Sequence, residues 1–181
     1  PMSYQTILDE NRKRLISMIQ QIPVRIPEGW TKVELGIGGL LYVGFSQVQT
    51  EKLICISSQG QSVIDCNTAQ VTFCEENYDE LELLAYAPML GEEMVQIAGE
   101  GGGGLRRMTK NGDFLDCVMP EWPKEKVIFM PQYHAWYMEP QFCSVVLDDF
   151  AVLVYGFSPC GNYFVIGTSD TLTIYRKQVN K

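Results

Sequence analysis

The chain has 181 residues, of which 46% are hydrophobic and 20% are charged, and its net charge is −8 at pH 7. The length is about that of one domain, and the composition is that of an ordinary globular protein rather than a disordered chain. The acidic balance argues against nucleic-acid binding, because phosphate backbones are bound by clustered Lys and Arg.

An amphipathic helix is predicted over residues 4–21. Apolar side chains such as Ile7 and Leu15 recur there at helical spacing. Ser3 can cap the first turn, and Pro23 stops the helix. We expect this helix to lie against the rest of the domain; the alternative is a detachable helix that binds a partner.

From Trp30 onward, short apolar segments are broken by Gly, Pro, Asn and Ser, which is typical of a meandering antiparallel sheet. Turns are predicted at residues 58–60 and 66–68 and at the pair Asp148 and Asp149. One further short helix is predicted over residues 77–85. The predicted strands cover residues 31–35, 40–45, 53–57, 62–65, 70–73, 94–98, 114–119, 126–130, 144–147, 151–157, 163–167 and 172–176.

These elements predict an α+β fold, with an N-terminal amphipathic helix followed by a mostly antiparallel β-sheet that forms a sandwich or a meander. We expect a single domain over residues 2–181, with the helix in residues 2–22 and a β-rich body in residues 30–176. A small or partial propeller-like fold is the alternative.

The alternative comes from residues 157–170, FSPCGNYFVIGTSD. This stretch resembles the F-S-P-x-G-x-x-h-x-x-G-S-x-D hairpin of propeller blades, in which a turn glycine joins two strands. Residues 60–71 and 111–115 resemble the same hairpin less closely. A complete propeller needs at least four blades of about 40 residues, and the chain has no regular repeat at that period.

A second resemblance involves residues 98–105, AGEGGGGL, followed by Thr109, Asn111 and the PEWP run at residues 120–123. Together they resemble the A-G-x-x-G-G-G-L…T-x-[DN]-G…P-x-W-P pattern of a family of uncharacterised microbial proteins. The resemblance covers residues 53–127. It implies that the glycine-rich loop is a family feature, and it carries over no catalytic residue.

The chain has six cysteines and one histidine, His134. No two cysteines have the spacing of a zinc knuckle or a redox motif, and one histidine cannot serve a site that needs two. We therefore expect reduced thiols, a cytoplasmic location, no metal and no cofactor. No stretch approaches the roughly 20 apolar residues that cross a bilayer, so we also expect no membrane partner.

The glycine loop, residues 99–107, holds five glycines in its first six positions. Such a run is an irregular loop, and consecutive backbone N–H groups followed by arginines can form an anion-binding nest. The run lacks the Lys-Ser/Thr ending of a P-loop and the strand-loop-helix setting of a dinucleotide site. It is an anion or ligand loop, a loop that lets a partner backbone approach, or a structural connection. The candidate anion-binding residues are Gly101, Gly102, Gly103, Gly104, Arg106 and Arg107.

An acidic cluster precedes the glycine loop, and no calcium-loop motif is present. The spacing of its carboxylates predicts a solvated face around the short helix, with an acidic docking patch as the functional alternative. The candidate partner-binding residues are Glu75, Glu76, Asp79, Glu80 and Glu82.

His134 lies in an aromatic cluster and is the alternative acid-base residue. One interpretation pairs it with a cysteine and Asp148; the other is a histidine that makes one hydrogen bond among aromatic rings. The chain has no G-x-S-x-G nucleophile motif.

The leading hypothesis is a non-catalytic protein-binding module whose acidic surface attracts a basic protein partner. A toxin-neutralising, immunity-type protein fits the size and charge. The alternative is a small-molecule or anion-binding protein, or an enzyme, that uses the glycine loop.

Overall fold

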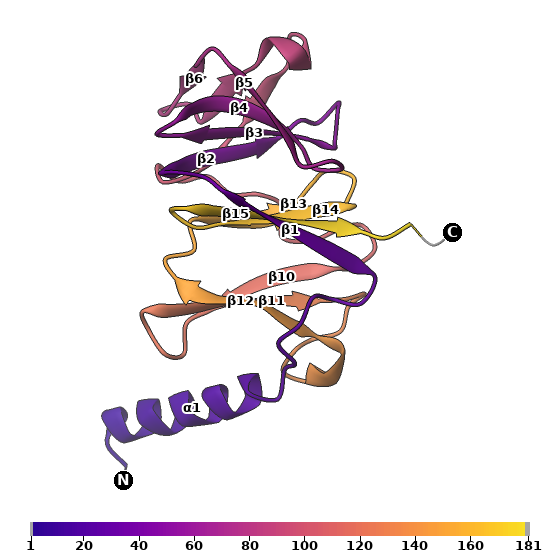
Figure 1. Cartoon of the computed structure of the whole chain (residues 1–181). Coiled ribbons are helices and arrows are strands. Elements are labelled where there is room, and N and C mark those ends of the chain that lie inside the picture. Colours follow the sequence, from indigo (N-terminus) through magenta and orange to yellow (C-terminus); the bar gives the residue numbers. More distant parts are fainter. Residues whose placement is uncertain (1, 180–181) are drawn as a thin grey trace. The chain divides into compact units, whose positions relative to one another are not determined.

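The computed structural model describes residues 2–179 and confirms an α+β fold, with one N-terminal helix followed by antiparallel strands (Figure 1). The chain divides into two compact units. The helix-bearing unit combines the chain up to Glu28 with Asn111–Ala151, and the layered unit combines Gly29–Lys110 with the chain from Val152 onward. The single domain over residues 2–181 stays a prediction.

Helix α1 covers Tyr4–Ile19 and begins and ends near its predicted bounds. The Ser3 hydroxyl accepts a hydrogen bond from the backbone N–H of Thr6 at 3.2 Å, which satisfies one free donor of the first turn. At the other end Gln20 is the C-cap. Ile22 then donates its backbone N–H to Ile19 at 2.9 Å, and this turn redirects the chain.

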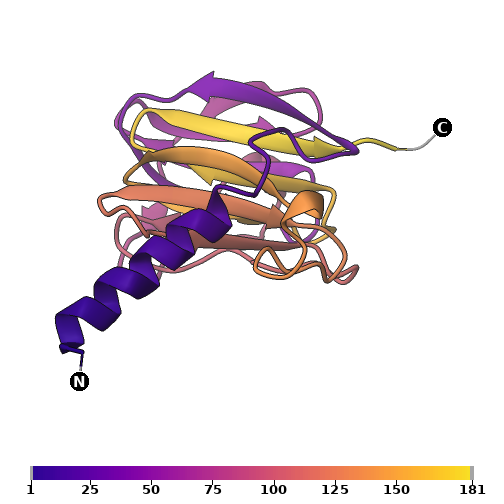
Figure 2. The ribbon, with the colours of Figure 1, turned by 90° about the horizontal axis from the view of Figure 1, so that it is seen from below.

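Only the C-terminal half of α1 is covered. Ile19 is buried, whereas the first half exposes apolar side chains such as Tyr4 and Ile7. Figure 2 shows this half extending beyond the strands of its own unit. The expectation that the whole helix lies against the domain is therefore correct for the C-terminal half only.

The helix-bearing unit contains a three-stranded antiparallel sheet in the order β10 (Phe114–Val118), β11 (Lys124–Met130) and β12 (Ser144–Phe150). A short 3₁₀ helix, η2 (Pro140–Phe142), leads into β12. One apolar cluster joins the end of α1 to this sheet. Its buried members are Ile19, Ile22, Ile128, Met130, Trp136, Cys143 and Val145.

The predicted turn at Asp148 and Asp149 is wrong, because both residues belong to β12. Lys126 on β11 lies opposite Asp148, and its ammonium is 2.7 Å from the carboxylate. Cross-strand ion pairs of this kind support strand pairing. The chain turns later, at Ala151 with a φ of 57°, so the next strand starts at Val154 rather than at residue 151.

The layered unit contains three antiparallel sheets that Figure 1 shows one above another. The outer four-stranded sheet has the order β1-β15-β14-β13, the central five-stranded sheet β5-β4-β3-β2-β9, and the outer three-stranded sheet β6-β7-β8. The strands are β1 (Trp30–Gly36), β2 (Leu40–Phe45), β3 (Lys52–Ser57), β4 (Gly60–Asp65), β5 (Gln70–Cys74), β6 (Tyr78–Asp79), β7 (Leu84–Tyr86), β8 (Met94–Gln96), β9 (Ala98–Gly99), β13 (Val154–Phe157), β14 (Tyr163–Gly167) and β15 (Thr171–Lys177), with the 3₁₀ helix η1 (Pro88–Leu90) between β7 and β8.

The central sheet is buried on both faces. Along β3, Leu53 and Cys55 belong to the cluster shared with the four-stranded sheet, while Ile54 and Ile56 belong to the cluster shared with the three-stranded sheet. Because successive side chains point to opposite faces of a strand, two apolar faces produce a continuous apolar run. This is why the sequence LICIS lacks the alternation of a half-exposed strand.

The four-stranded sheet joins the start of the layered unit to its end. β1 pairs with β15 over its full length, from Trp30 opposite Lys177 to Gly36 opposite Thr171. The Trp30 ring also packs edge-on against Phe164 on β14, with ring centroids 4.9 Å apart. The turns predicted at residues 58–60 and 66–68 are confirmed as the links from β3 to β4 and from β4 to β5.

The helix predicted over residues 77–85 is wrong. This segment forms β6, a turn and β7, and Tyr78 lies opposite Ala85. Two local features prevent a helix: the Asp79 side chain accepts hydrogen bonds from the turn, and Leu83 has a φ of 54°. Ala85 is fully buried against the central sheet, so tertiary packing outweighs the helical preference of the glutamates and leucines.

Candidate functional site

The five predicted partner-binding carboxylates lie on the acidic hairpin, which we define as residues 75–86. All five residues are exposed, but on a hairpin rather than on the predicted helix. The Asp79 carboxylate accepts the backbone N–H of Leu81 at 2.8 Å and that of Glu82 at 3.0 Å. This Asx turn holds Leu81, 94% exposed, at the tip between acidic residues.

A buried amide anchors the base of the acidic hairpin to the central sheet. Gln61 on β4 is fully buried, and its side chain donates to the carbonyl of Tyr86 at 2.7 Å. The same side chain accepts the backbone N–H of Asn77 at 2.9 Å. Both ends of the hairpin are thus held by one side chain, which makes the exposed carboxylates part of a defined surface.

The acidic hairpin and the glycine loop meet at Tyr42 on β2. Tyr42 is 3% exposed, and burial together with the Glu80 carboxylate raises its pKa, although a hydrogen bond with the backbone of Gly101 opposes this. Burial and the same Glu80 also raise the pKa of Tyr78, whose ring centroid is 6.2 Å from that of Tyr42. Two features that are separate in the sequence therefore share one tyrosine pair.

Close packing and backbone conformation explain why several positions of the glycine loop are glycine. A β-carbon on Gly99 would lie 1.9 Å from the carbonyl oxygen of Leu41, and one on Gly101 would lie 2.5 Å from the Tyr42 hydroxyl. Gly102 and Gly103 have φ values of 115° and 78°, which side chains rarely adopt. For Gly104, by contrast, no atom lies within 4 Å of an added β-carbon and no such φ applies.

The loop also borders a pocket of about 150 Å³, the Arg106 pocket. Arg106 is its only charged lining residue, beside the amides of Gln47 and Gln96. The neighbouring Arg107 is placed differently, because its guanidinium lies 5.4 Å from the centroid of the Tyr155 ring. The structure thus separates two arginines that the sequence analysis treated together. The remaining lining residues are Phe45, Gly104, Leu105, Phe157 and Pro159.

His134 lies in the helix-bearing unit and pairs with Glu139 rather than with Asp148. Its Nδ1 is 2.6 Å from the Glu139 carboxylate, and its ring lies at a tilt against that of Phe142, with centroids 4.6 Å apart. The nearby Cys143 thiol is buried, burial raises its pKa to about 11, and it points at backbone carbonyls. A thiol in this state is protonated at neutral pH, which disfavours a nucleophilic role.

The cysteines are free thiols, and the described residues contain no group of three His, Cys, Asp or Glu side chains placed to hold a metal ion. Burial raises the pKa of both Cys55 and Cys66 to about 12. Cys160 is exposed: burial acts to raise its pKa, but hydrogen bonds from Ser158, Thr50 and backbone groups outweigh it and lower the pKa.

Three residues that shape these surfaces were not predicted from the sequence. Tyr42 and Gln61 lie in strands whose partners become clear only after folding. Leu81 is an apolar residue inside an acidic run, and this is the one local signal that could have drawn attention to it.

Within residues 2–179, no helix combines the length and apolar character that crossing a membrane requires. The sequence matches no protein-family model and no curated protein.

Proposed function

We propose that this protein binds a basic protein partner through the acidic hairpin. The observation that carries the proposal is the position of Leu81, which an Asx turn holds almost fully exposed between carboxylates. Interfaces commonly combine an apolar anchor with a charged rim, and a surface of one sign accelerates association with a partner of the opposite sign.

The acidic residues of the layered unit differ in how much of their charge is used internally. Glu93, outside the hairpin, accepts hydrogen bonds from Ser46 at 2.5 Å and from the backbone of Gln47 at 2.6 Å, so its role is structural. The side chains of Glu75 and Glu82, in contrast, make no hydrogen bond or ion pair within residues 2–179. Their charge is therefore available to a partner.

The direct test is capture of the partner from source-cell lysate at low and high salt. The test variant is Glu75→Lys/Glu76→Lys/Glu82→Lys, which leaves the Asp79 turn intact. The matched control is Glu10→Lys/Glu28→Lys/Glu92→Lys, which changes the net charge equally at exposed positions elsewhere.

A protein bound by the wild type and the control but lost by the test variant and at high salt supports the proposal. Equal retention by both variants, or equal loss by both, contradicts it. The captured protein is then purified and titrated against Leu81→Asp, for which we expect at least tenfold weaker binding. A toxin-neutralising role further requires that the complex inhibit the partner's own activity.

A second candidate function rests on the Arg106 pocket. A guanidinium beside two amides and apolar side chains suits a small organic anion. The test is titration with benzoate and inorganic phosphate, followed by NMR of the arginine side chains. We expect the anion to shift the Arg106 side-chain signals, and Arg106→Gln should abolish binding. Arg107→Gln changes the arginine beside the Tyr155 ring and should leave binding unchanged. The reverse result contradicts this function.

A further inference from the structure

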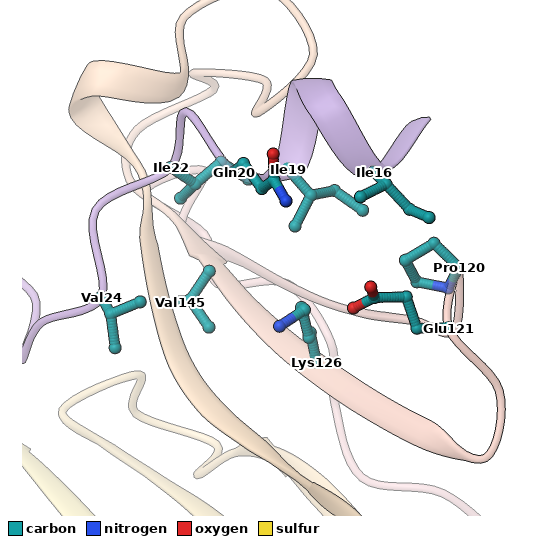
Figure 3. A pocket seen from close by; sticks show the side chains of 9 residues that line it. All are labelled: Ile16, Ile19, Gln20, Ile22, Val24, Pro120, Glu121, Lys126 and Val145. Atoms are coloured by element: carbon teal, nitrogen blue, oxygen red, sulfur yellow. The ribbon is translucent and has the colours of Figure 1, made fainter. Parts of the chain in front are cut away.

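A pocket of about 230 Å³ opens between the C-terminal end of α1 and the end of the β10–β11 hairpin, entirely within the helix-bearing unit (Figure 3). Most of its wall is aliphatic. Ile16, Ile19 and Ile22 form the side that belongs to the N-terminal segment, and Pro120 and Val145 face them.

Backbone pairing keeps this pocket open. After α1 the chain turns and runs beside β12, where Val24 forms a parallel bridge with Val145 and the Val145 N–H donates to the carbonyl of Pro23 at 2.9 Å. The bridge holds the segment after α1 against the sheet, while the preceding turn of α1 carries Ile16 over Pro120 (Figure 3). Backbone contacts therefore define the shape of the pocket, and a preorganised site lowers the cost of binding.

The lining is completed by Val24 and by three polar side chains, Gln20, Glu121 and Lys126. The Lys126 charge is matched, because its ammonium is 2.7 Å from the carboxylate of Asp148. Glu121 is exposed, and its carboxylate makes no ion pair or hydrogen bond within residues 2–179. One negative charge at the pocket therefore lacks a counter-charge.

We propose that this pocket binds a small aliphatic molecule that carries one ammonium group. The aliphatic wall contacts the hydrocarbon chain of the ligand, and the Glu121 carboxylate pairs with its ammonium group. An apolar cavity of about 150 Å³ is enough for benzene, so the present volume accommodates a chain of about six carbons. An anionic head is disfavoured, because it would face Glu121, and the Lys126 ammonium in the lining is already paired with the Asp148 carboxylate.

The pocket provides its own probes, since three isoleucines line it. In protein labelled with ¹³C at isoleucine methyl groups, hexylammonium should shift the Ile16, Ile19 and Ile22 signals. Isoleucines in the layered unit should stay unchanged. Hexanol has the same body without the charge, and we expect it to bind about fivefold more weakly, the difference expected for one partly exposed ion pair. Hexanoate should bind more weakly than hexanol.

Two variants separate the contribution of the ligand's hydrocarbon chain to binding from that of its ammonium group. Ile16→Trp fills the pocket from its half-exposed edge and should abolish the methyl shifts with all three probes. Glu121→Gln keeps the shape of the side chain but removes its charge, so the affinities for hexylammonium and hexanol should then differ by less than twofold. Glu75→Gln, which removes an exposed charge in the layered unit, should retain the wild-type preference.

The proposal is overturned if the three probes bind equally to the wild type, if the shifts spread evenly over all isoleucines, or if Ile16→Trp binds as well as the wild type. None of these outcomes bears on the acidic hairpin, because the test uses residues of the other unit.

Discussion

The hydroxyl of Tyr42 packs closely against the backbone of Gly101, so a central strand of the layered unit contacts the glycine loop at its second glycine. The contact is tight, since a β-carbon on Gly101 would lie 2.5 Å from that hydroxyl oxygen. The glycine is thus required by a close approach, and the same tyrosine lies beside Glu80 of the acidic hairpin.

We expect Gly101→Ala to lower the Tm by roughly 3–10 °C, because the added methyl would overlap the hydroxyl of the buried Tyr42 side chain. In a Tyr42→Phe background the nearest remaining ring atom is 3.4 Å away, so most of the cost of Gly101→Ala should disappear. Calorimetry of the double-mutant cycle measures this coupling. Gly104→Ala, which meets no atom within 4 Å, is the control and should leave the Tm unchanged. An equal cost of Gly101→Ala in both backgrounds would refute the close-contact explanation.

Asp79→Ala should loosen the tip of the acidic hairpin, because two backbone N–H groups lose their acceptor. The measurement is amide hydrogen exchange, in which we expect Leu81 and Glu82 to exchange several-fold faster. Asp79→Asn keeps an acceptor oxygen and should exchange at close to the wild-type rate. Unchanged exchange in Asp79→Ala would mean that the turn does not depend on the carboxylate.

Acid should weaken the layered unit through Asp65. Burial acts to raise the pKa of this carboxyl, but hydrogen bonds from Lys52 and from the N–H groups of Asn67 and Thr68 outweigh it and lower the pKa. A group with a lowered pKa stabilises the fold above its ordinary value of about 3.9, and this contribution is lost as the pH falls below that value through the lowered pKa. Urea unfolding at pH 6, 4 and 3 measures the loss. Asp65→Asn should show a smaller decline over this range, and an identical decline would contradict the assignment.

Cys160 should be the first thiol modified in the native protein. It is exposed and its pKa is lowered, whereas burial raises the pKa of both Cys55 and Cys66 to about 12. Mass spectrometry after brief iodoacetamide treatment at pH 7.5 identifies the site. Ser158→Ala removes a hydrogen bond to the sulfur and should slow the reaction several-fold. Faster labelling of Cys55 or Cys66 would contradict this order.

Local pattern was enough to predict α1 and most of the strands. The helical spacing of its apolar residues and the Ser3 cap predicted α1, because both act within a few residues. The turns at residues 58–60 and 66–68 were predicted for the same reason, since their residue types favour tight turns whatever lies around them.

The acidic hairpin shows where local pattern fails. Its glutamates and leucines favour a helix, and the carboxylates were correctly predicted to be exposed, but the segment folds as β6 and β7. The energy that decides this comes from Ala85 buried in the core and from the Gln61 anchor, both of which involve residues distant in the sequence.

By itself, the sequence determined the α+β class, the position of the helix and of most strands, and the acidic charge, because these follow from composition and from preferences within a few neighbouring residues. Only the tertiary structure decided that β1 pairs with β15, that Tyr42 joins the glycine loop to the acidic hairpin, and that Arg106 and Arg107 have different surroundings. Such contacts join positions far apart in the chain, and their free energy comes from burying both partners together, a quantity that neither segment encodes alone.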